Sequence, residues 1–358
     1  MIGAPRKLAS QMVRATRERR DLNGRRPPRF GTGPDDGGPA RVFYLSPDLD
    51  RPSGGVRNIY RHVDVLADLG IEATVVHSRS GFRCGWFANT TRVAAAADVR
   101  LRPRDILVTT EWHGPWLHTL PADVRKVAFN QGPYCTFDAT PFAQSDPGAP
   151  YAAVPGLEAL LTVSEDGERL LEYAFPRLTT RRARPVVDGA VFHPAAQPRG
   201  PRLGYLARGR RSEERDQLLH ILRSRGALDG WELVPAGGSE AETARLMGSC
   251  SLFLSFGYRE GFGLPPAEAM ASGCYVIGYP SLGGTEFFDP AYCSPVAESD
   301  LVAYGRAVEE AMRLFTADPE ATAQTGLKAS AAILDRYSVA GLTEDLRSFY
   351  SSLLPATA

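Results

Sequence analysis

Residues 251–279 read SLFLSFGYREGFGLPPAEAMASGCYVIGY and contain, in order, an apolar run, a glycine-rich loop, two prolines and a second apolar run. The run at 251–255 predicts a buried strand, and the prolines at 265 and 266 suit the first turn of a helix. Gly273 predicts the end of that helix, before a strand at 274–279. A strand, a helix and a parallel strand in this order form a right-handed βαβ unit.

The same alternation extends outward through the chain in two series. The first has strand patterns at 41–46, 71–77, 105–110, 124–130 and 159–164 and a helix at 56–69, and the second adds strands at 202–207 and 231–235 and helices at 212–225 and 239–247. Strands separated by helices indicate parallel sheets covered by helices. At about 100–200 residues per domain, the length of 358 residues suggests two domains. We therefore predict an α/β protein with two doubly wound, Rossmann-like parallel-sheet domains facing each other across a cleft.

These patterns also set the expected domain boundaries. We predict Rossmann-like domains over residues 41–192 and 193–338, and a C-terminal helix within 339–358 that packs back toward the first domain. We expect residues 1–40 to be a basic, disordered arm and linker, because TGPDDGGP (32–39) has the composition of a linker.

Charge and composition exclude several classes of protein. The chain has 41 basic and 41 acidic residues, which argues against a nucleic-acid binder with a basic surface. No apolar run reaches the roughly 18–20 residues of a membrane helix. The five cysteines form no CxxC pair, which argues against a disulfide scaffold or a cysteine-rich zinc site and fits the cytoplasm.

Residues 1–30 hold nine basic and two acidic residues, a net charge of +7 in a chain with no overall charge. This arm has no apolar core of 7–15 residues, so it is not a secretory signal. It could attach weakly to anionic lipid at the inner face of the cell membrane. The alternative, which we favour, is a disordered tail or extra residues from an upstream start codon.

The loop at 260–264 and the helix after it offer consecutive N–H groups at a helix N-terminus, which suit a diphosphate. Glu260 opens this loop and Glu268 lies in the first turn of the helix. Both can accept hydrogen bonds from hydroxyls, one from a sugar and the other from a ribose. On spacing alone, a solvated Glu260 and a Glu268 that serves only the helix dipole would explain the pattern equally well.

A second glycine loop, SGGVRNIY (53–60), follows the first strand and opens the first helix. Gly54 and Gly55 let backbone N–H groups approach a ligand, although such a loop is often only a turn. It is neither GxGxxG nor GxxxxGK[ST]. Just upstream, Asp48 and Asp50 could hold a divalent cation, but an acidic turn is the interpretation that we favour.

Taken together, EGFGLPPAEAMASG (260–273) resembles family 4 glycosyltransferases, which adopt the two-domain GT-B fold. The resemblance extends to SGGVRNIYRHVDVLADLGIEATVVH (53–77), LLTVSEDGERLL (160–171) and VVDGAVFHP (186–194), where Asp188 stands in place of the usual asparagine. It covers roughly residues 41–350. It implies an N-terminal acceptor domain and a C-terminal domain that binds a nucleotide-sugar donor.

The resemblance also implies roles for individual residues on the donor side. Glu260 would contact the hydroxyls of the donor sugar, and Glu268 those of the ribose. Arg208, in LARGRRSEE (206–214), would bind the diphosphate, together with Arg210 or Arg211 in place of the family's lysine. Arginine suits phosphate but is not geometrically equivalent to lysine. The backbone amides expected to meet sugar and phosphate are those of Gly261, Phe262, Gly263 and Leu264.

On the other side of the cleft, Gly54 and Gly55 would lie near the donor phosphates or the reacting sugar. His113 follows a strand in TTEWHGPW and is predicted to face the cleft as a catalytic residue, although a packed histidine is an equal alternative. Asn130, Gln131 and Tyr134 (FNQGPY) follow another strand and are predicted to line the acceptor side.

The resemblance thus implies a retaining, hexosyltransferase-type enzyme that uses a nucleoside-diphosphate sugar, needs no metal or cofactor and assembles cell-envelope polysaccharide in the cytoplasm. The acceptor would be a glycan, a lipid-linked sugar or a small molecule. Two alternatives remain: a nucleotide-sugar epimerase, and a catalytically silent nucleotide-sugar-binding protein of the same fold. A nicotinamide dehydrogenase is disfavoured because no GxGxxG loop is evident.

Overall fold

Apolar strands in the first half of the chain form a seven-stranded parallel sheet, in a computed structural model that describes residues 22–138, 140 and 142–354. The sheet order is β4-β3-β2-β6-β7-β8-β9, and its central strands are buried along their whole length, as expected when helices cover both faces. The strands are β2 (Val42–Leu45), β3 (Ala73–His77), β4 (Val93–Ala95), β6 (Ile106–Thr110), β7 (Arg125–Asn130), β8 (Leu157–Thr162) and β9 (Thr179–Arg182).

Two α-helices and a 3-10 helix carry the features of this first body that matter below. The α-helices are α2 (Gly54–Asp68) and α3 (Glu165–Ala174), and the 3-10 helix is η2 (Glu111–Thr119). Ser53 begins α2 because its side chain accepts a hydrogen bond from the N–H of Val56.

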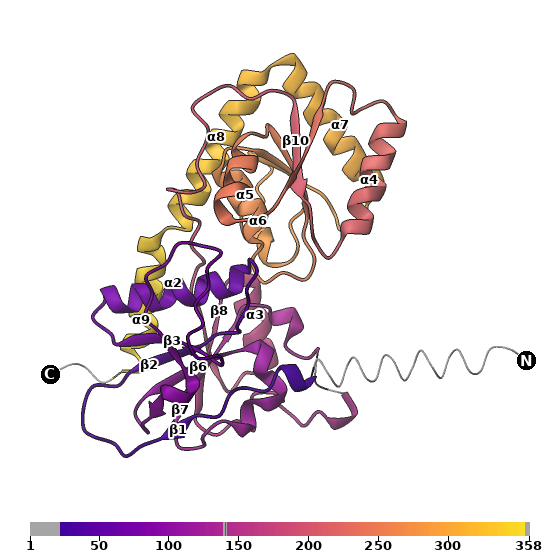
Figure 1. The fold of residues 1–358 in the computed structure, drawn as a ribbon. Coiled ribbons are helices and arrows are strands. Elements are labelled where there is room, and N and C mark those ends of the chain that lie inside the picture. The colour runs from indigo at the N-terminus through magenta and orange to yellow at the C-terminus, as the bar shows by residue number, and fades with distance from the viewer. Residues whose placement is uncertain (1–21, 139, 141, 355–358) are drawn as a thin grey trace, which may run out of the picture.

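The second body is a five-stranded parallel sheet of order β11-β10-β12-β13-β14. Its strands are β10 (Arg202–Leu206), β11 (Glu232–Ala236), β12 (Leu252–Phe256), β13 (Tyr275–Tyr279) and β14 (Cys293–Pro295). Its helices are α4 (Ser212–Ser224), α5 (Glu240–Gly248), α6 (Leu264–Ala271), α7 (Leu301–Ala317) and α8 (Pro319–Arg336). Figure 1 shows the second body above the first, with α8 descending from one toward the other.

The chain ends by returning to the first body. Helix α9 (Val339–Ser351) packs against α2 (Figure 1). The Tyr350 hydroxyl lies 2.9 Å from that of Tyr44 in β2, and Arg184 donates to Asp345 at 2.8 Å. The first body is therefore built from both ends of the chain.

The part of the predicted arm and linker that the structure describes is ordered against the first body. The short strand β1 (Gly31–Thr32) pairs with β5 (Arg100–Leu101), and Asp35 and Asp36 form ion pairs with Arg104 and Arg102. These contacts explain why residues 22–40 differ from the expected free linker. Residues 1–21 lie outside the described residues. No helix in the described part of the chain is both long and apolar enough to span a membrane.

Candidate active site

The site lies where loops that follow strands of the two sheets meet. The loop after β12 contacts the loop after β7: Arg259 donates to the Tyr134 carbonyl and, at 2.9 Å, to Asp138. Gly261 lies directly against the Gln131 carbonyl oxygen, where a side chain has no room. Ligands of open α/β sheets bind outside the carboxyl ends of the strands, so this seam between the two bodies is the candidate site.

Glu260 is held at this seam by its backbone. Its N–H donates to the Ser281 hydroxyl at 3.0 Å, and its carbonyl accepts from the N–H of Gly283 at 3.2 Å. Its carboxylate has no hydrogen-bond partner among the described residues. Burial raises the pKa of Glu260, and the nearby positive charge of Arg210 opposes that shift. A carboxylate in this situation can accept hydrogen bonds from a ligand.

Helix α6 begins at Leu264, four residues after Glu260, because of two local features. Gly263 adopts a left-handed φ of 98°, which favours glycine, and Pro265 and Pro266 fill the first turn. The predicted donor loop, Gly261–Leu264, therefore ends at a helix N-terminus, where backbone N–H groups lack intrahelical partners.

The three arginines after β10 differ in what they contact. Arg208 is exposed and has no partner among the described residues. Arg210 reaches across the seam, with Nη1 4.0 Å from the Cys135 sulfur. Arg211 instead donates to Glu214 at 2.8 Å and to Glu298 at 2.7 Å and lies over two tyrosine rings. Arg210, rather than Arg211, is available for a diphosphate.

Glu268 forms an ion pair with Arg57 of α2, and Arg57 also pairs with Glu240 at the start of α5. Burial alone would lower the pKa of Arg57, but the two carboxylates outweigh it and the net shift is upward. Glu268, the residue that the resemblance assigns to the ribose, is thus in contact with the opposite body. The sequence analysis missed Arg57 and Glu240, because 211 and 183 residues separate Arg57 from its two partners.

The first glycine loop meets the start of α6 at Gly54. A side-chain carbon at Gly54 would come 2.5 Å from Leu264, and one at Gly55 would come 3.3 Å from the Gln131 side chain. Leu264 of the second body therefore packs against a position of the first body that has no room for a side chain.

The three acceptor-side candidates do not share one environment. Gln131 donates to the Gly55 carbonyl at 2.9 Å, and the Tyr134 hydroxyl donates to Asp166 at 2.6 Å, both beside the seam. Asn130 is fully buried, and its amide donates to Thr136 at 2.6 Å and to Tyr151 at 2.9 Å. The expectation that Asn130 lines the cleft is therefore wrong. Its side chain is buried beneath Thr136 and Tyr151, to which it is hydrogen-bonded.

His113 also lies apart from the other predicted site residues. It is buried beneath the arm, and Nδ1 is 2.7 Å from the Arg25 carbonyl, with burial lowering the pKa of the imidazole. Trp116 donates to the Leu22 carbonyl at 2.7 Å. These contacts fasten the arm to η2, so the placement of His113 gives no support to its predicted catalytic role.

Two further carboxylates lie at or near the seam. Glu111, directly after β6, accepts from the Gln131 N–H at 3.0 Å, and burial raises its pKa. Glu286, which GGTEFF (283–288) also suggests for a position near the nucleotide, accepts from the N–H of Glu165 at 2.7 Å and from the Tyr337 hydroxyl at 2.8 Å. Glu286 therefore fastens the two bodies together. It ends a 3-10 helix, Gly283–Glu286, in which Gly283 lies against the Gly261 carbonyl oxygen of the donor loop.

The suspected metal-binding pair is occupied by protein groups. Asp48 lies 2.9 Å from His77 Nδ1 and accepts from the N–H groups of Ser78 at 3.1 Å and Arg79 at 2.9 Å. It acts as the acidic turn that we favoured from the sequence.

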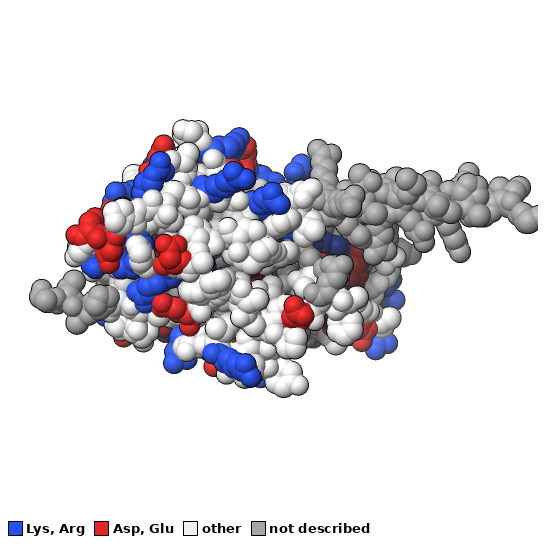
Figure 2. Space-filling view, turned by 90° about the horizontal axis from the view of Figure 1, so that it is seen from below, with Lys and Arg blue, Asp and Glu red and all other residues white. Residues whose placement is uncertain are grey.

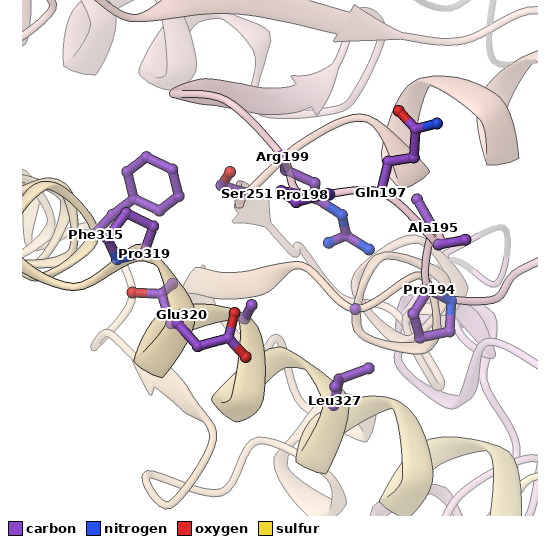
Figure 3. Close-up of a pocket in the computed structure, with 14 residues that line it drawn as sticks. Pro194, Ala195, Gln197, Pro198, Arg199, Ser251, Phe315, Pro319, Glu320 and Leu327 are labelled. Atoms are coloured by element: carbon purple, nitrogen blue, oxygen red, sulfur yellow. The ribbon is translucent and has the colours of Figure 1, made fainter.

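A separate cavity of about 260 Å³ lies behind the second body, between the linker at 194–199 and helices α7 and α8 (Figure 3). Its main charged group, Arg199, donates to the carbonyls of Cys250, at 3.0 Å, and Ser272. Glu320 accepts from Gln324 at 2.8 Å. Because these charges already have partners, this cavity is not the candidate active site.

Residues 196–325, about a third of the chain, match the family model described as glycosyl transferases group 1. The match contains Glu260, Glu268 and all three arginines after β10. This part of the second body is therefore similar to that family.

Two curated relatives resemble parts of the chain. Human alpha-1,3/1,6-mannosyltransferase ALG2 is 31% identical over 116 residues, which is 32% of this chain and 27% of that protein. An alpha-1,6-glucosyltransferase of Actinobacillus pleuropneumoniae serotype 7 is 34% identical over 82 residues, 22% of this chain and 25% of that protein. The chain thus spans about a quarter of the length of each.

Solved structures match nearly the whole chain. Sucrose-phosphate synthase from Thermosynechococcus elongatus has a TM-score of 0.64 at 14% identity and covers 88% of this chain and 99% of its own. HepE from Anabaena, described in complex with UDP and glucose, has a TM-score of 0.60 at 12% identity and covers 87% and 100%. These likenesses confirm the predicted GT-B fold of two Rossmann-like bodies.

Proposed function

We propose that this protein is a retaining glycosyltransferase that moves a hexosyl group from a nucleoside-diphosphate sugar to a hydroxyl of a glycan, lipid-linked or small-molecule acceptor. The observation that carries the proposal is Glu260. Its carboxylate lies at the seam without a partner among the described residues, beside Arg210 and at the start of α6. That is the arrangement needed to hold sugar hydroxyls beside a bound diphosphate.

Each group then has a task that its chemistry suits. Arg208 and Arg210 bind the diphosphate, since guanidinium groups form paired, charge-assisted hydrogen bonds with phosphate oxygens. The N–H groups of the loop at 261–264 add to this at the helix N-terminus. Glu268 binds the ribose. As the bond to the sugar breaks, these cations stabilise the charge that grows on the leaving phosphate.

We propose that transfer needs no metal ion. The arginines after β10 supply the positive charge that a divalent cation would otherwise bring to the diphosphate. Asp48, the carboxylate with a metal-like motif, is already held by His77 and two backbone N–H groups. The acceptor hydroxyl would enter from the first body, near Gln131 and Tyr134.

A binding panel tests the proposal first. Thermal unfolding is measured with UDP, GDP, the corresponding nucleotide sugars and NAD, each with and without EDTA. A ligand at 100 times its Kd should stabilise the fold by about 2.7 kcal/mol. Stabilisation by one nucleoside diphosphate, unchanged by EDTA, is the expected result. Stabilisation by NAD alone, or by no nucleotide, would contradict it.

Product analysis separates this function from its two alternatives. A transferase releases nucleoside diphosphate only when an acceptor hydroxyl or water takes the sugar. An epimerase would change the donor without any acceptor, and a silent binding protein would leave the donor intact. NMR of the glycosidic product reports whether the anomeric configuration is retained.

We also propose that the basic arm gives a weak peripheral contact with anionic membrane, where envelope polysaccharide is assembled. Figure 2 shows basic and acidic groups scattered around an uncharged area on the described surface of one face. We attribute the attraction to lipid to the arm's own arginines and Lys7. Deleting residues 1–21 should abolish sedimentation with anionic vesicles, and unchanged sedimentation would contradict this role.

A further inference from the structure

Three charged side chains form a cluster, called here the seam triad, between the two bodies. Arg57 on α2 donates through Nη1 to Glu240 and through Nη2 to Glu268. The side chains of Arg57, Glu240 and Glu268 are only 15%, 18% and 8% exposed. The guanidinium thus forms two ion pairs at once, and both are largely shielded from water.

The seam triad joins the two bodies. Arg57 belongs to a helix of the first body, whereas Glu240 and Glu268 belong to α5 and α6 of the second. Removing one member of a buried ion pair is strongly destabilising, because the other charge loses its compensation. While the bodies are in contact, the three charges compensate one another, in an arrangement in which Leu264 also meets Gly54.

This closed arrangement competes with the binding role given to Glu268. A ribose presents two neighbouring hydroxyls, which a carboxylate can accept with its two oxygens. Arg57 already occupies Oε1 of Glu268. A nucleoside that takes both oxygens must either share Oε1 with Arg57 or displace it. Glu240 offers the guanidinium a second partner, so that withdrawal need not leave a buried cation unpaired.

We propose that Arg57 is an interdomain latch that competes with the ribose of the donor for Glu268. Without donor, Arg57 bridges Glu240 and Glu268 and holds the seam closed. With donor, Glu268 turns to the ribose and Arg57 stays on Glu240. This inference rests on the proposed function, since it requires a nucleotide at Glu268.

Variants of the triad shift nucleotide affinity in opposite directions. Arg57→Met removes the competitor, so the full chain should bind UDP or GDP at least about threefold more tightly, because a larger fraction is competent to bind. Glu240→Gln removes the charge of the second partner and commits Arg57 to Glu268, so binding should weaken by a similar factor. Arg57→Lys cannot reproduce the two-pronged contact and should fall between wild type and Arg57→Met.

Arg61→Met is the matched control. Arg61 lies one turn further along the same helix and pairs with Asp188 at 2.8 Å, away from Glu268. Its loss should leave nucleotide affinity within error of wild type. Small-angle scattering without nucleotide provides a second measurement, in which Arg57→Met should increase the radius of gyration and Arg61→Met should not.

Isothermal titration of the wild type and the four variants with UDP and with GDP decides the matter. Equal or weaker binding by Arg57→Met, with wild type binding normally, would overturn the latch and make Arg57 a positioning residue for Glu268. Failure of every protein to bind either nucleotide would instead contradict the proposed function, and the latch would fall with it. If Arg57→Met does not fold, the order of wild type, Arg57→Lys and Glu240→Gln still tests the proposal.

Discussion

The carbonyl oxygen of Gln131 lies against the α-carbon of Gly261, so that the loop after β7 in one body touches the loop after β12 in the other. A side-chain carbon at position 261 would come 2.0 Å from that oxygen, so any side chain there would clash with it. The geometry of the donor loop therefore depends on the absence of a side chain at this position.

Gly261→Ala should push the two loops apart. Overpacking of a tight contact costs about 1–3 kcal/mol, and here much of that cost can be relieved by opening the seam. We expect kcat/KM to fall at least about tenfold while thermal stability changes little. Gly209→Ala is the control, because a side-chain carbon there meets nothing within 4 Å among the described residues. Wild-type turnover in Gly261→Ala would show that the contact is dispensable.

Glu260→Ala should lower turnover far more than it weakens nucleotide binding, because in our proposal its carboxylate contacts the sugar rather than the nucleotide. Loss of one group that acts mainly in the transition state costs roughly 100-fold in kcat. Initial rates with a competent acceptor give kcat, and titration with the nucleoside diphosphate gives Kd. Glu213→Gln, an exposed carboxylate on α4, should behave like wild type. An unchanged kcat would remove Glu260 from the reaction.

Arg210→Met and Arg211→Met should separate binding from stability. Hydrogen bonds to charged groups contribute about 1.5–3 kcal/mol, so losing Arg210 should weaken diphosphate binding by about tenfold or more. Losing Arg211 should chiefly lower the melting temperature, since it frees Glu214 and Glu298. Titration and thermal unfolding of both variants provide the comparison. The reverse pattern would assign the family's lysine position to Arg211.

Acid should destabilise the protein partly through His62, which is buried beside Tyr44 and Phe129. Burial lowers its pKa in the folded state to about 3, while the unfolded chain has the ordinary value near 6.5. The unfolded state therefore binds the proton first, and stability is lost as pH falls below 6.5. Between pH 7 and pH 5 the loss from one such group is about 2 kcal/mol.

Denaturant unfolding at both pH values measures this loss. His62→Gln should show a smaller difference between pH 7 and pH 5 than wild type, whereas the exposed His220→Gln should match wild type. An identical pH dependence in His62→Gln would mean that the imidazole gains its proton without cost.

The two-domain α/β architecture could be predicted from the sequence because apolar runs form the central strands of both sheets. The helix predicted at 56–69 is observed at Gly54–Asp68, and the one predicted at 212–225 at Ser212–Ser224. The strands β1, β4, β5, β9 and β14 were missed. They are two to four residues long and lie at sheet edges or in the two-stranded sheet, and TTRR in β9 has no apolar pattern.

The candidate site was predictable where local sequence determines it, and not where the bodies meet. Glu260 and the start of α6 follow from one continuous motif. The pairing of Arg57 with Glu268 does not, because it depends on the angle between two bodies. His113 and Asn130 were misplaced for a related reason. A polar residue after a strand can face the cleft, or it can be buried under another segment of the same body. The sequence does not distinguish the two.

Helix α9 has a consequence for how the protein is made. Domains generally fold in order as the chain leaves the ribosome, yet the first body receives α9 only after the entire second body has been synthesised. Until then, Tyr44 and the face of α2 that α9 covers remain without their final partner. The nascent first body therefore stays incomplete until α9 (Val339–Ser351) has been synthesised.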